Sequence, residues 1–436
     1  ASRRFGLQRP YCWCSEPHVG FCEKAAKSMT LEISPDLGRG IKRLAIGVPS
    51  YNEIATIREV TRLIDARAAQ LPKRVEITIV NSDNQSPDGT SAAFSAVRTQ
   101  AAKVALLTAP GVSGKGNNFL EIFGFAQRWK ADALICLDAD LEEIPEDWLL
   151  SYFEALSSGA DLVVPLYPRH WYDGNLTNQV VAPLVATTSH AIRQPIGGDF
   201  GFSKKAVSFL HYLKWPLKAR GFGVDVFVVM RCIDAGLNII QQPLSTGKIH
   251  SWRSDTPDEV LAEMSTKFFE VVGMLLEEIN RLPSSLCTPA KTVFPIAPPL
   301  SAPEKLYDPS HIIATSRTTW ATRRELVGNS DLFNGPTYED PPVLNDSEWA
   351  DVLAALVFLG RDKNKHTALL KAFETLFYAR LATALPGLRD RDVESMVVML
   401  ARAVSALLAF GDLKAGSARP SIHNRDRERN VDGSME

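Results

Sequence analysis

Strand and helix patterns alternate five times between residues 44 and 166, and this alternation constrains the fold more than any other feature of the chain. Short apolar runs predict strands at 44–48, 75–80, 104–107, 133–137 and 162–166. Apolar residues at helical spacing predict helices at 54–71, 89–101, 117–129 and 145–156. The alternation predicts an α/β fold with a mostly parallel sheet flanked by helices. Ligands of such sheets bind outside the carboxyl ends of the strands.

The remaining segments differ in pattern. Residues 1–40 lack periodicity and are expected to form an N-terminal arm, whereas residues 41–281 form the α/β domain. Within that domain, further helices are expected near 176–192, 204–212, 223–235 and 260–279. The Pro-, Ser-, Thr- and Asn-rich stretch 282–345 predicts an extended linker. Three helical patterns in 346–411 predict a helical C-terminal domain, expected to support a homodimer, and the polar residues 412–436 predict a disordered tail.

Composition narrows the classes of partner. The net charge of -2 gives no basic field for nucleic acid or anionic lipid. No apolar run reaches 18 residues, because Arg402 interrupts the longest candidate, 396–410, so no membrane span is expected. No signal-peptide pattern is visible. These features favour a soluble cytoplasmic enzyme.

Cysteines cluster near the N-terminus. Cys12, Cys14 and Cys22 lie beside His18, and three thiolates with an imidazole could complete a zinc site. The Cys-x-Cys spacing departs from the usual two-residue gap, which favours a flexible or partner-covered segment instead. Cys136, Cys232 and Cys287 are scattered.

Polar turns follow the first two predicted strands. The first contains Pro49, Tyr51 and Glu53, which could meet a nucleotide base or ribose. The alternative is an ordinary helix start with Asn52 as its cap. In the second turn Asp83 could accept hydrogen bonds from a base or ribose, and the alternative is a loop capped by Asp88.

A glycine-rich turn follows the third strand. Gly111, Gly114 and Gly116 would let the backbone approach a ligand closely, and Lys115 adds a positive charge at a helix start that favours an anion. The spacing is not that of a Walker A loop. A flexible surface loop is the alternative interpretation.

The fourth predicted strand runs into Asp138-Ala139-Asp140. At strand spacing the two carboxylates would point the same way and repel each other unless a cation neutralises them. Hard oxygen ligands suit Mg²⁺ or Mn²⁺, which could bridge a diphosphate. The alternative is a solvated acidic turn that continues into Glu142 and Glu143.

Together these motifs resemble the GT-A glycosyltransferases, a Rossmann-like class in which an Asp-x-Asp motif holds the metal and the nucleotide diphosphate. Three later segments are similar to those of mannosylglycerate synthases and glucosyl-3-phosphoglycerate synthases, namely Arg193-Gln194-Pro195-Ile196-Gly197-Gly198-Asp199, Gly223-Val224-Asp225 and Gly247-Lys248-Ile249-His250. Glu348-Trp349-Ala350 resembles their helical C-terminal region, so the resemblance runs in order from residue 44 to 411.

The resemblance implies a set of roles. His250 would join Asp138 and Asp140 as the third metal ligand, and Lys115 would contact the diphosphate. Asp138 and Ala139 would contact the nucleotide sugar, and Gly197 and Gly198 would allow the donor sugar to approach. Asp225 would lie at the sugar or acceptor end as a catalytic residue. Arg169 would pair with an acceptor carboxylate or phosphate, for which a guanidinium fork is suited, although a surface ion pair is the alternative.

The expected reaction is a retaining transfer of glucose or mannose from a UDP-, GDP- or ADP-linked donor to glycerate or 3-phosphoglycerate. The aromatic loop 170–175 instead favours a saccharide acceptor. An inverting transferase, with Asp225 as the base, is the nearest rival. A nucleotidyltransferase would need a glycine-rich signature where Pro49-Ser50-Tyr51-Asn52 stands. A non-catalytic regulatory domain fits poorly with intact Asp138, Asp140 and His250.

Overall fold

The computed structural model describes residues 40–112, 114–170, 173–188, 190–249, 257–282, 310–333, 335–390 and 393–414. Three sequence-based expectations lie outside these residues. They are the N-terminal arm with Cys12, Cys14, His18 and Cys22, the proposed metal ligand His250, and the polar tail beyond residue 414.

A seven-stranded sheet forms the centre of the α/β part, in the order β3-β2-β1-β4-β6-β5-β7. Its strands are β1 (Arg43–Ser50), β2 (Glu76–Asp83), β3 (Ala102–Leu107), β4 (Ala133–Cys136), β5 (Leu162–Leu166), β6 (Phe200–Ser203) and β7 (Ile239–Pro243). Only β6 runs antiparallel to its neighbours, β4 and β5, among the described strand pairs. The predicted mostly parallel sheet is therefore confirmed.

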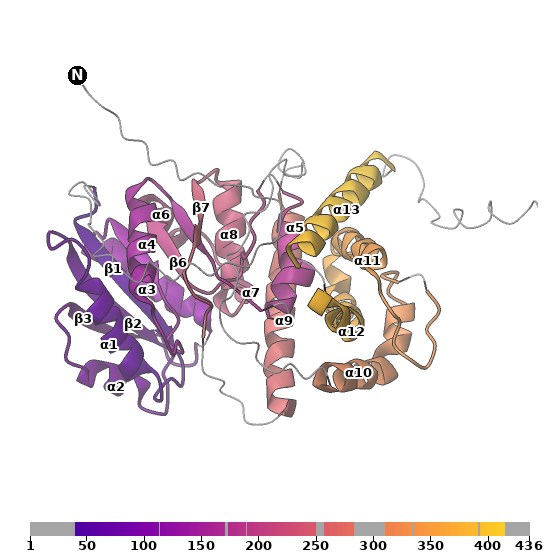
Figure 1. Cartoon of the computed structure of the whole chain (residues 1–436), viewed down its shortest axis with the longest axis horizontal. Helices are drawn as coiled ribbons and strands as arrows, with labels where there is room; N and C mark the ends of the chain where they lie inside the picture. Colours follow the sequence, from indigo (N-terminus) through magenta and orange to yellow (C-terminus); the bar gives the residue numbers. More distant parts are fainter. Residues whose placement is uncertain are drawn as a thin grey trace, which may run out of the picture. The chain divides into compact units, whose positions relative to one another are not determined.

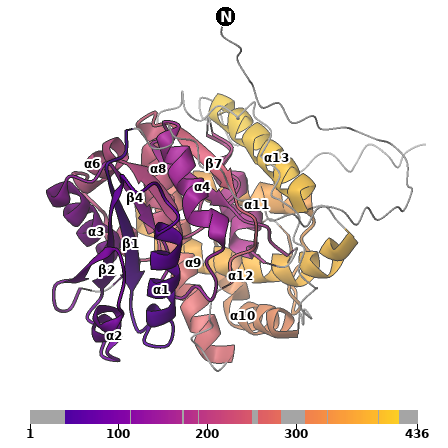
Figure 2. The same ribbon diagram turned by 60° about the vertical axis from the view of Figure 1, so that its left-hand side comes forward.

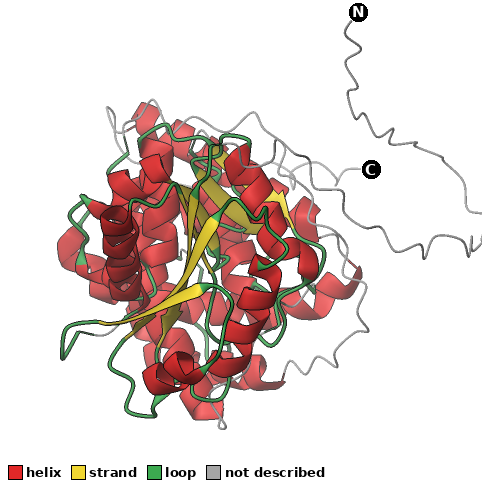
Figure 3. Ribbon diagram, turned by 90° about the vertical axis from the view of Figure 1, so that its left-hand side faces the viewer, coloured by secondary structure: helices red, strands yellow, loops and turns green. Residues whose placement is uncertain are grey.

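Helices cover both faces of this sheet (Figure 3). On one face Leu44 and Ile46 pack with α1 (Ile57–Ala68), α2 (Thr90–Ala96) and α4 (Glu146–Ser157). On the other face Ala45 packs in the cluster that contains α3 (Lys115–Trp129), α6 (Lys204–His211) and α8 (Val224–Asp234). Because successive strand residues point to opposite faces, one nearly continuous apolar strand serves both cores.

Residues 170–250 depart from the expected pattern. The strands β6 and β7 were not predicted, since one has only four residues and the other ends in polar residues. The expected helix at 176–192 is shorter, with a π-helix η1 (Thr177–Val181) that continues into α5 (Ala182–Val185). The hydroxyls of Thr187 and Thr188 donate to the carbonyl oxygens of Leu184 and Val185. These bonds satisfy the last turn and favour a helix end.

The helices after the sheet are α7 (Leu217–Arg220), α9 (Pro257–Ile279), α10 (Ser310–Gly328), α11 (Asp346–Leu359), α12 (His366–Ala384) and α13 (Val393–Lys414). The three helices predicted for 346–411 are confirmed. The extended linker is wrong for residues 310–328, which form α10. Thr315, Thr319 and Thr322 bond back to helix carbonyls there, so a Thr-rich composition did not prevent a helix.

One apolar cluster joins the helices of the sheet face to the C-terminal helices. It runs from Phe119 through Phe227 and Val272 to Trp349 and Phe373. In Figures 1 and 2, α9 lies between the α/β part and helices α10 to α13. The described residues after residue 39 accordingly belong to one compact unit. Among the described residues no helix is long and apolar enough to cross a membrane.

Candidate active site

The antiparallel strand β6 decides which residues meet at the site. Phe200 pairs with Cys136, so residues 197–199, just before β6, lie beside residues 137–140, just after β4. Strand β7 is parallel to β5, with Pro243 opposite Leu166. Residues after β4, β5 and β7 therefore gather at one edge of the sheet with those before β6.

A cluster of lysines and aspartates occupies this edge. Lys115 Nζ lies 2.7 Å from Asp138 Oδ1, and Lys248 Nζ lies 2.6 Å from Asp138 Oδ2. Lys115 Nζ is also 3.8 Å from Asp225 Oδ1, at the start of α8. Lys248 Nζ is 3.1 Å from Asp199 Oδ2. The predicted residues Lys115, Asp138 and Asp225 are thus brought together, with Lys248 and Asp199 added.

Asp199 holds this cluster in place. Its Oδ1 accepts the backbone N–H of Asp138 at 2.8 Å, and its Oδ2 accepts the hydroxyl of Tyr167. The side chain of Asp199 is fully buried. Because a buried carboxylate with several donors is orientationally fixed, Asp199 sets the position of the turn that carries Asp138.

Gly197 and Gly198 also belong to the cluster. Lys248 donates to the Gly197 carbonyl at 3.2 Å, and Lys115 donates to the Gly198 carbonyl at 3.1 Å. Gly198 has φ of +90°, and a methyl group added there would lie 2.6 Å from Asp138 Oδ2. Glycine at this position is therefore required both by its backbone conformation and by the closeness of Asp138.

Burial and the mutual attraction of these charges shift their pKa values. Burial alone would lower the pKa of Lys115, but Asp138 and Asp225 outweigh it and the pKa is raised. Burial likewise opposes ionisation of Asp138, yet Lys115 and Lys248 hold its pKa below the ordinary value. For Asp225, burial outweighs Lys115 and raises the pKa. At neutral pH the two lysines are charged and Asp138 is ionised.

Two of the three glycines near Lys115 face protein backbone. A methyl group at Gly116 would lie 1.9 Å from the Ala219 carbonyl oxygen, and one at Gly114 would lie 2.4 Å from the Arg220 carbonyl oxygen. Gly116 N–H donates to the Gly221 carbonyl at 3.2 Å. The glycines therefore let the start of α3 pack against the α7–α8 turn. The predicted flexible-loop alternative is wrong for Gly114 and Gly116.

Residues predicted to contact the nucleotide lie at the ends of β1 and β2. Tyr51 is 42% exposed, whereas Glu53 and Asp83 are buried, and Pro49 lies in β1 opposite Ser82. Asp83 accepts bonds from Ser50 Oγ and from the backbone and hydroxyl of Ser86. The Thr56 hydroxyl bridges Glu53 Oε2 and the Ala139 carbonyl, at 3.3 and 2.8 Å, so the β1 and β4 turns are joined.

The two alternatives for these turns have different outcomes. Asn52 does not cap a helix, because α1 begins at Ile57 after Thr56, so that alternative is wrong. Asp88 does cap its loop: its carboxylate accepts the backbone N–H groups of Thr90 at 2.9 Å and Ile54 at 3.1 Å.

Arg169 lies just beyond the end of β5. Its Nε donates to Gln194 Oε1 at 3.3 Å, and its Nη1 lies 3.6 Å from Asp173 Oδ2. The guanidinium is also 5.8 Å from the centre of the Tyr167 ring. Arg169 therefore forms a local ion pair with Asp173. It also lies near the ring of Tyr167, whose hydroxyl donates to Asp199.

Asp138, one of the predicted metal ligands, has two partners other than a metal. Both oxygens of Asp138 face ammonium groups, so Asp138 could ligate a metal only if one lysine moved. Strand β4 ends at Cys136, before Asp138, so the strand-spacing argument for parallel carboxylates does not apply. Within the described residues no three His, Cys, Asp or Glu side chains form a metal-binding group. Glu142 N–H donates to the carbonyl of Ile249 at 3.0 Å, so the acidic turn lies beside the residue that precedes His250.

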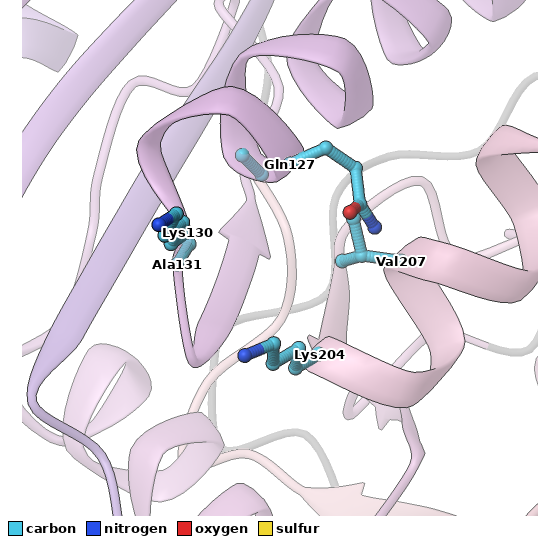
Figure 4. Close-up of a pocket in the computed structure, with 6 residues that line it drawn as sticks. Gln127, Lys130, Ala131, Lys204 and Val207 are labelled. Carbon is cyan, nitrogen blue, oxygen red and sulfur yellow. The ribbon is translucent and has the colours of Figure 1, made fainter.

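A small pocket of about 210 Å³ lies elsewhere, at the end of α3 and the start of α6 (Figure 4). Lys130 and Lys204 are among its lining residues. Lys204 follows β6 and Ala131 precedes β4, so the pocket is at the opposite edge of the sheet from the lysine–aspartate cluster.

Comparison with known proteins agrees with this geometry. Residues 45–206 match the sequence profile of glycosyl transferase family 2. The matched segment contains β1 to β6 and the Asp138-Ala139-Asp140 turn. The chain is a glycosyltransferase with a GT-A domain, and the predicted fold class and enzyme class are confirmed.

Among solved structures, the chain is similar to glucosyl-3-phosphoglycerate synthase from Mycobacterium tuberculosis. The complex with Mg²⁺ and uridine diphosphate is 23% identical, with a TM-score of 0.45, over 57% of this chain and 82% of that one. The complex with Mn²⁺, UDP-glucose and phosphoglyceric acid is 22% identical, with a TM-score of 0.44 and the same coverage. No curated protein sequence matches the chain.

Sequence reasoning missed three residues of the cluster, namely Lys248, Asp199 and Tyr167. Asp199 follows Gly197 and Gly198 in the sequence, and Lys248 lies two residues before His250. The sequence analysis assigned roles to these neighbours and not to Asp199 or Lys248. A signal was available, because a lysine and an aspartate in otherwise small or apolar segments need partners when buried. Their partner, Asp138, is distant in sequence and only the fold identifies it.

Proposed function

We propose that the chain transfers glucose or mannose from a nucleoside diphosphate sugar to a small hydroxy acid, with retention of the anomeric configuration. The observation that carries this proposal is the pair of buried ammonium groups, Lys115 and Lys248, at the carboxyl edge of a glycosyltransferase sheet. Cleavage of the donor leaves negative charge on the diphosphate. Fixed positive charges in a water-poor site stabilise such charge strongly.

Lys115 and Lys248 would bind the diphosphate, and Asp138 keeps both ammonium groups in position before the donor arrives. Tyr51, Glu53, Asp83, Pro49 and Ala139 remain our candidates for the nucleoside side. Gly197 and Gly198 would border the donor sugar, because they contact both lysines through their carbonyl groups. Asp225, 3.8 Å from Lys115, would face a sugar hydroxyl or the acceptor.

A divalent cation, Mg²⁺ or Mn²⁺, remains part of the proposal. Asp140 and His250 would hold it, and Asp138 would join them only by releasing a lysine. When bound, the cation supplies further positive charge to the leaving diphosphate.

The acceptor is proposed to be an anion, such as glycerate or 3-phosphoglycerate. Arg169 supports an anionic acceptor, because its guanidinium lies at the same edge of the sheet as the lysine–aspartate cluster. Its distance of 3.6 Å to Asp173 is longer than a hydrogen bond, so the guanidinium can also bind an acceptor anion. A guanidinium fork matches a carboxylate or phosphate through two parallel hydrogen bonds.

The test is release of nucleoside diphosphate from UDP-, GDP- and ADP-linked glucose and mannose, with 3-phosphoglycerate, glycerate or glucose as acceptor. Each reaction is run with Mn²⁺ and with EDTA. We expect acceptor-dependent release with one donor and Mn²⁺, and a loss of roughly 100-fold in kcat for Lys115→Met and for Lys248→Met. Absence of release with every donor and acceptor would contradict the proposal, and glucose as the preferred acceptor would contradict its anionic part.

Inversion is a second candidate, favoured by one observation. Asp225 is buried, and its Oδ1 has no hydrogen-bond partner within the described part of the chain. Its raised pKa suits a group that accepts a proton from an acceptor hydroxyl. The anomeric configuration of the product decides: an α-linked product from an α-linked donor supports retention, and a β-linked product assigns Asp225 as the base.

A further inference from the structure

An ion pair joins helix α13 to the segment that leads to Gly197 and Gly198. Arg193 Nε lies 2.6 Å from Glu394 Oε2, and Arg193 Nη2 donates to Glu394 Oε1 at 2.8 Å. The Arg193 side chain is 4% exposed, so water screens the pair poorly. A bidentate pair of this kind fixes both distance and orientation.

The next residue, Gln194, connects this pair to Arg169. Its Oε1 accepts Tyr167 N–H at 3.1 Å and Arg169 Nε–H at 3.3 Å. Its side-chain amide donates to the Tyr167 carbonyl at 2.8 Å. Gln194 is buried and holds three groups of the β5 end at once. A continuous path therefore runs from Glu394 through Arg193 and Gln194 to Arg169.

The C-terminal helices also contact the π-helix η1, which follows Arg169 in the chain. Trp349 Nε1 donates to the Gln179 carbonyl at 2.8 Å, and Arg380 Nε donates to Gln179 Oε1 at 3.1 Å. Gln179 is fully buried. Such π-helical turns in proteins often occur at functional sites. Helices α11 and α12 thus contact η1, which follows Arg169 in the chain, and α13 contacts Arg193, the neighbour of Gln194.

We infer that Arg193 and Glu394 are positioning residues for Arg169, so that helix α13 sets the affinity for an anionic acceptor. This inference rests on the proposed function, which assigns Arg169 to the acceptor. The nucleotide-side residues at β1 and β2 lie on the other half of the sheet, beyond β4. Loss of the pair should therefore weaken acceptor binding and leave donor binding unchanged.

The kinetic test compares Arg193→Met, Glu394→Ala and Glu394→Gln with the wild-type full chain, using UDP-glucose, 3-phosphoglycerate and Mn²⁺. We expect the KM for 3-phosphoglycerate to rise roughly tenfold in Arg193→Met and Glu394→Ala, as expected when a charged hydrogen-bonded pair is lost. The KM for UDP-glucose should change less than about twofold, because its site lies beyond β4. Glu394→Gln retains an acceptor oxygen and should lie between wild type and Glu394→Ala.

Arg323→Met is the matched control. Arg323 Nη1 lies 2.5 Å from the buried Glu374 carboxylate, so this variant also breaks an ion pair among the C-terminal helices. It touches neither Gln179 nor Arg193 in the described contacts. Its KM for 3-phosphoglycerate should equal that of the wild type. A tenfold rise in this control, or equal rises in both KM values for Glu394→Ala, would overturn the inference in favour of general destabilisation.

Hydrogen exchange separates failure of the inference from failure of the proposed function, because it needs no substrate. Exchange of backbone amides in 166–170 and 173–180 should be faster in Glu394→Ala than in the wild type and unchanged in Arg323→Met. Unchanged exchange in Glu394→Ala overturns the inference even if the enzyme is active. A second outcome is faster exchange in Glu394→Ala together with a wild-type enzyme that does not transfer sugar to 3-phosphoglycerate. That outcome supports the structural coupling and contradicts the proposed acceptor.

Discussion

Both carboxylate oxygens of Asp138 face ammonium groups, which changes the role expected for this residue. In isolation two aspartates at a strand end indicate a cation site. The structure instead places Lys115 and Lys248 at 2.7 and 2.6 Å from Asp138. Positive charge is therefore already present beside Asp138, and our proposal assigns the metal to Asp140 and His250.

At the residue scale we predict that Asp140→Asn weakens Mn²⁺ binding at least tenfold, because an amide oxygen is a poorer ligand for a hard cation than a carboxylate. Mn²⁺ titration followed by electron paramagnetic resonance measures this directly. Glu143→Gln is the control, since it removes the same charge from an exposed position in the same acidic stretch. Equal effects of both variants would favour the solvated acidic turn that the sequence left open.

At the scale of elements, the start of α3 and the α7–α8 turn form one unit. Gly114 and Gly116 flank Lys115 and allow backbone contact with residues 219–221. Glu270 of α9 accepts the Phe222 N–H at 2.6 Å from the other side of the turn. Lys115 and Asp225 are therefore held by a single junction of α3, α7, α8 and α9, which fixes their 3.8 Å separation.

We predict that Gly116→Ala destabilises the protein by about 3 kcal/mol and abolishes transfer, because its methyl group would lie 1.9 Å from a backbone carbonyl oxygen. Thermal unfolding and kcat are the measurements. Gly124→Ala, on the same helix, meets only side chains, namely the end of Arg128 at 3.2 Å and the His211 ring at 3.5 Å. This control should change stability by less than about 1 kcal/mol, since alanine favours a helix. Equal loss in both variants would contradict the proposed junction.

At the scale of the whole molecule, the α/β part and the C-terminal helices share one apolar core. The ring centre of Phe268 in α9 lies 5.6 and 5.3 Å from those of Phe373 and Phe377 in α12, in tilted arrangements. Val272 of α9 belongs to the cluster that covers the sheet. The C-terminal helices therefore belong to the same compact unit as the sheet. Their proposed role in acceptor binding rests on the Arg193–Glu394 pair, which this shared core holds in place.

Burial also predicts the reactivity of two thiols. Cys136 and Cys232 are fully buried, and burial raises the pKa of each thiol above its usual range, although Lys115 partly opposes this at Cys136. Because alkylation requires the thiolate, both should resist iodoacetamide at pH 8 in the native protein and react after unfolding. Peptide mass mapping checks this. Native labelling of Cys136 would show that the core beneath the site opens readily.

The order of strands and helices between residues 43 and 166 was determined by the sequence itself, because hydrophobic periodicity is a local property. The same is true of the three helices after residue 346, where Asn345 and Glu348 form a capping box at the start of α11. The turns that carry Lys115 and Asp138 could also be found this way, since ligand sites follow strand ends, whereas Asp225 was identified only from the family resemblance.

Tertiary structure alone decided which of these residues meet. Lys248 contacts Asp138 across 110 residues, and Arg193 contacts Glu394 across 201. Both contacts depend on the pairing of the short strands β6 and β7 with the rest of the sheet. The sequences of these strands carry little periodic signal. The partner of a glycine is equally invisible in a sequence, so Gly116 could be assigned to a ligand until the Ala219 carbonyl was seen beside it. Local sequence patterns specify helices and strands. Buried charges and glycines find their partners in other helices and strands, so only the folded chain shows which residues those partners are.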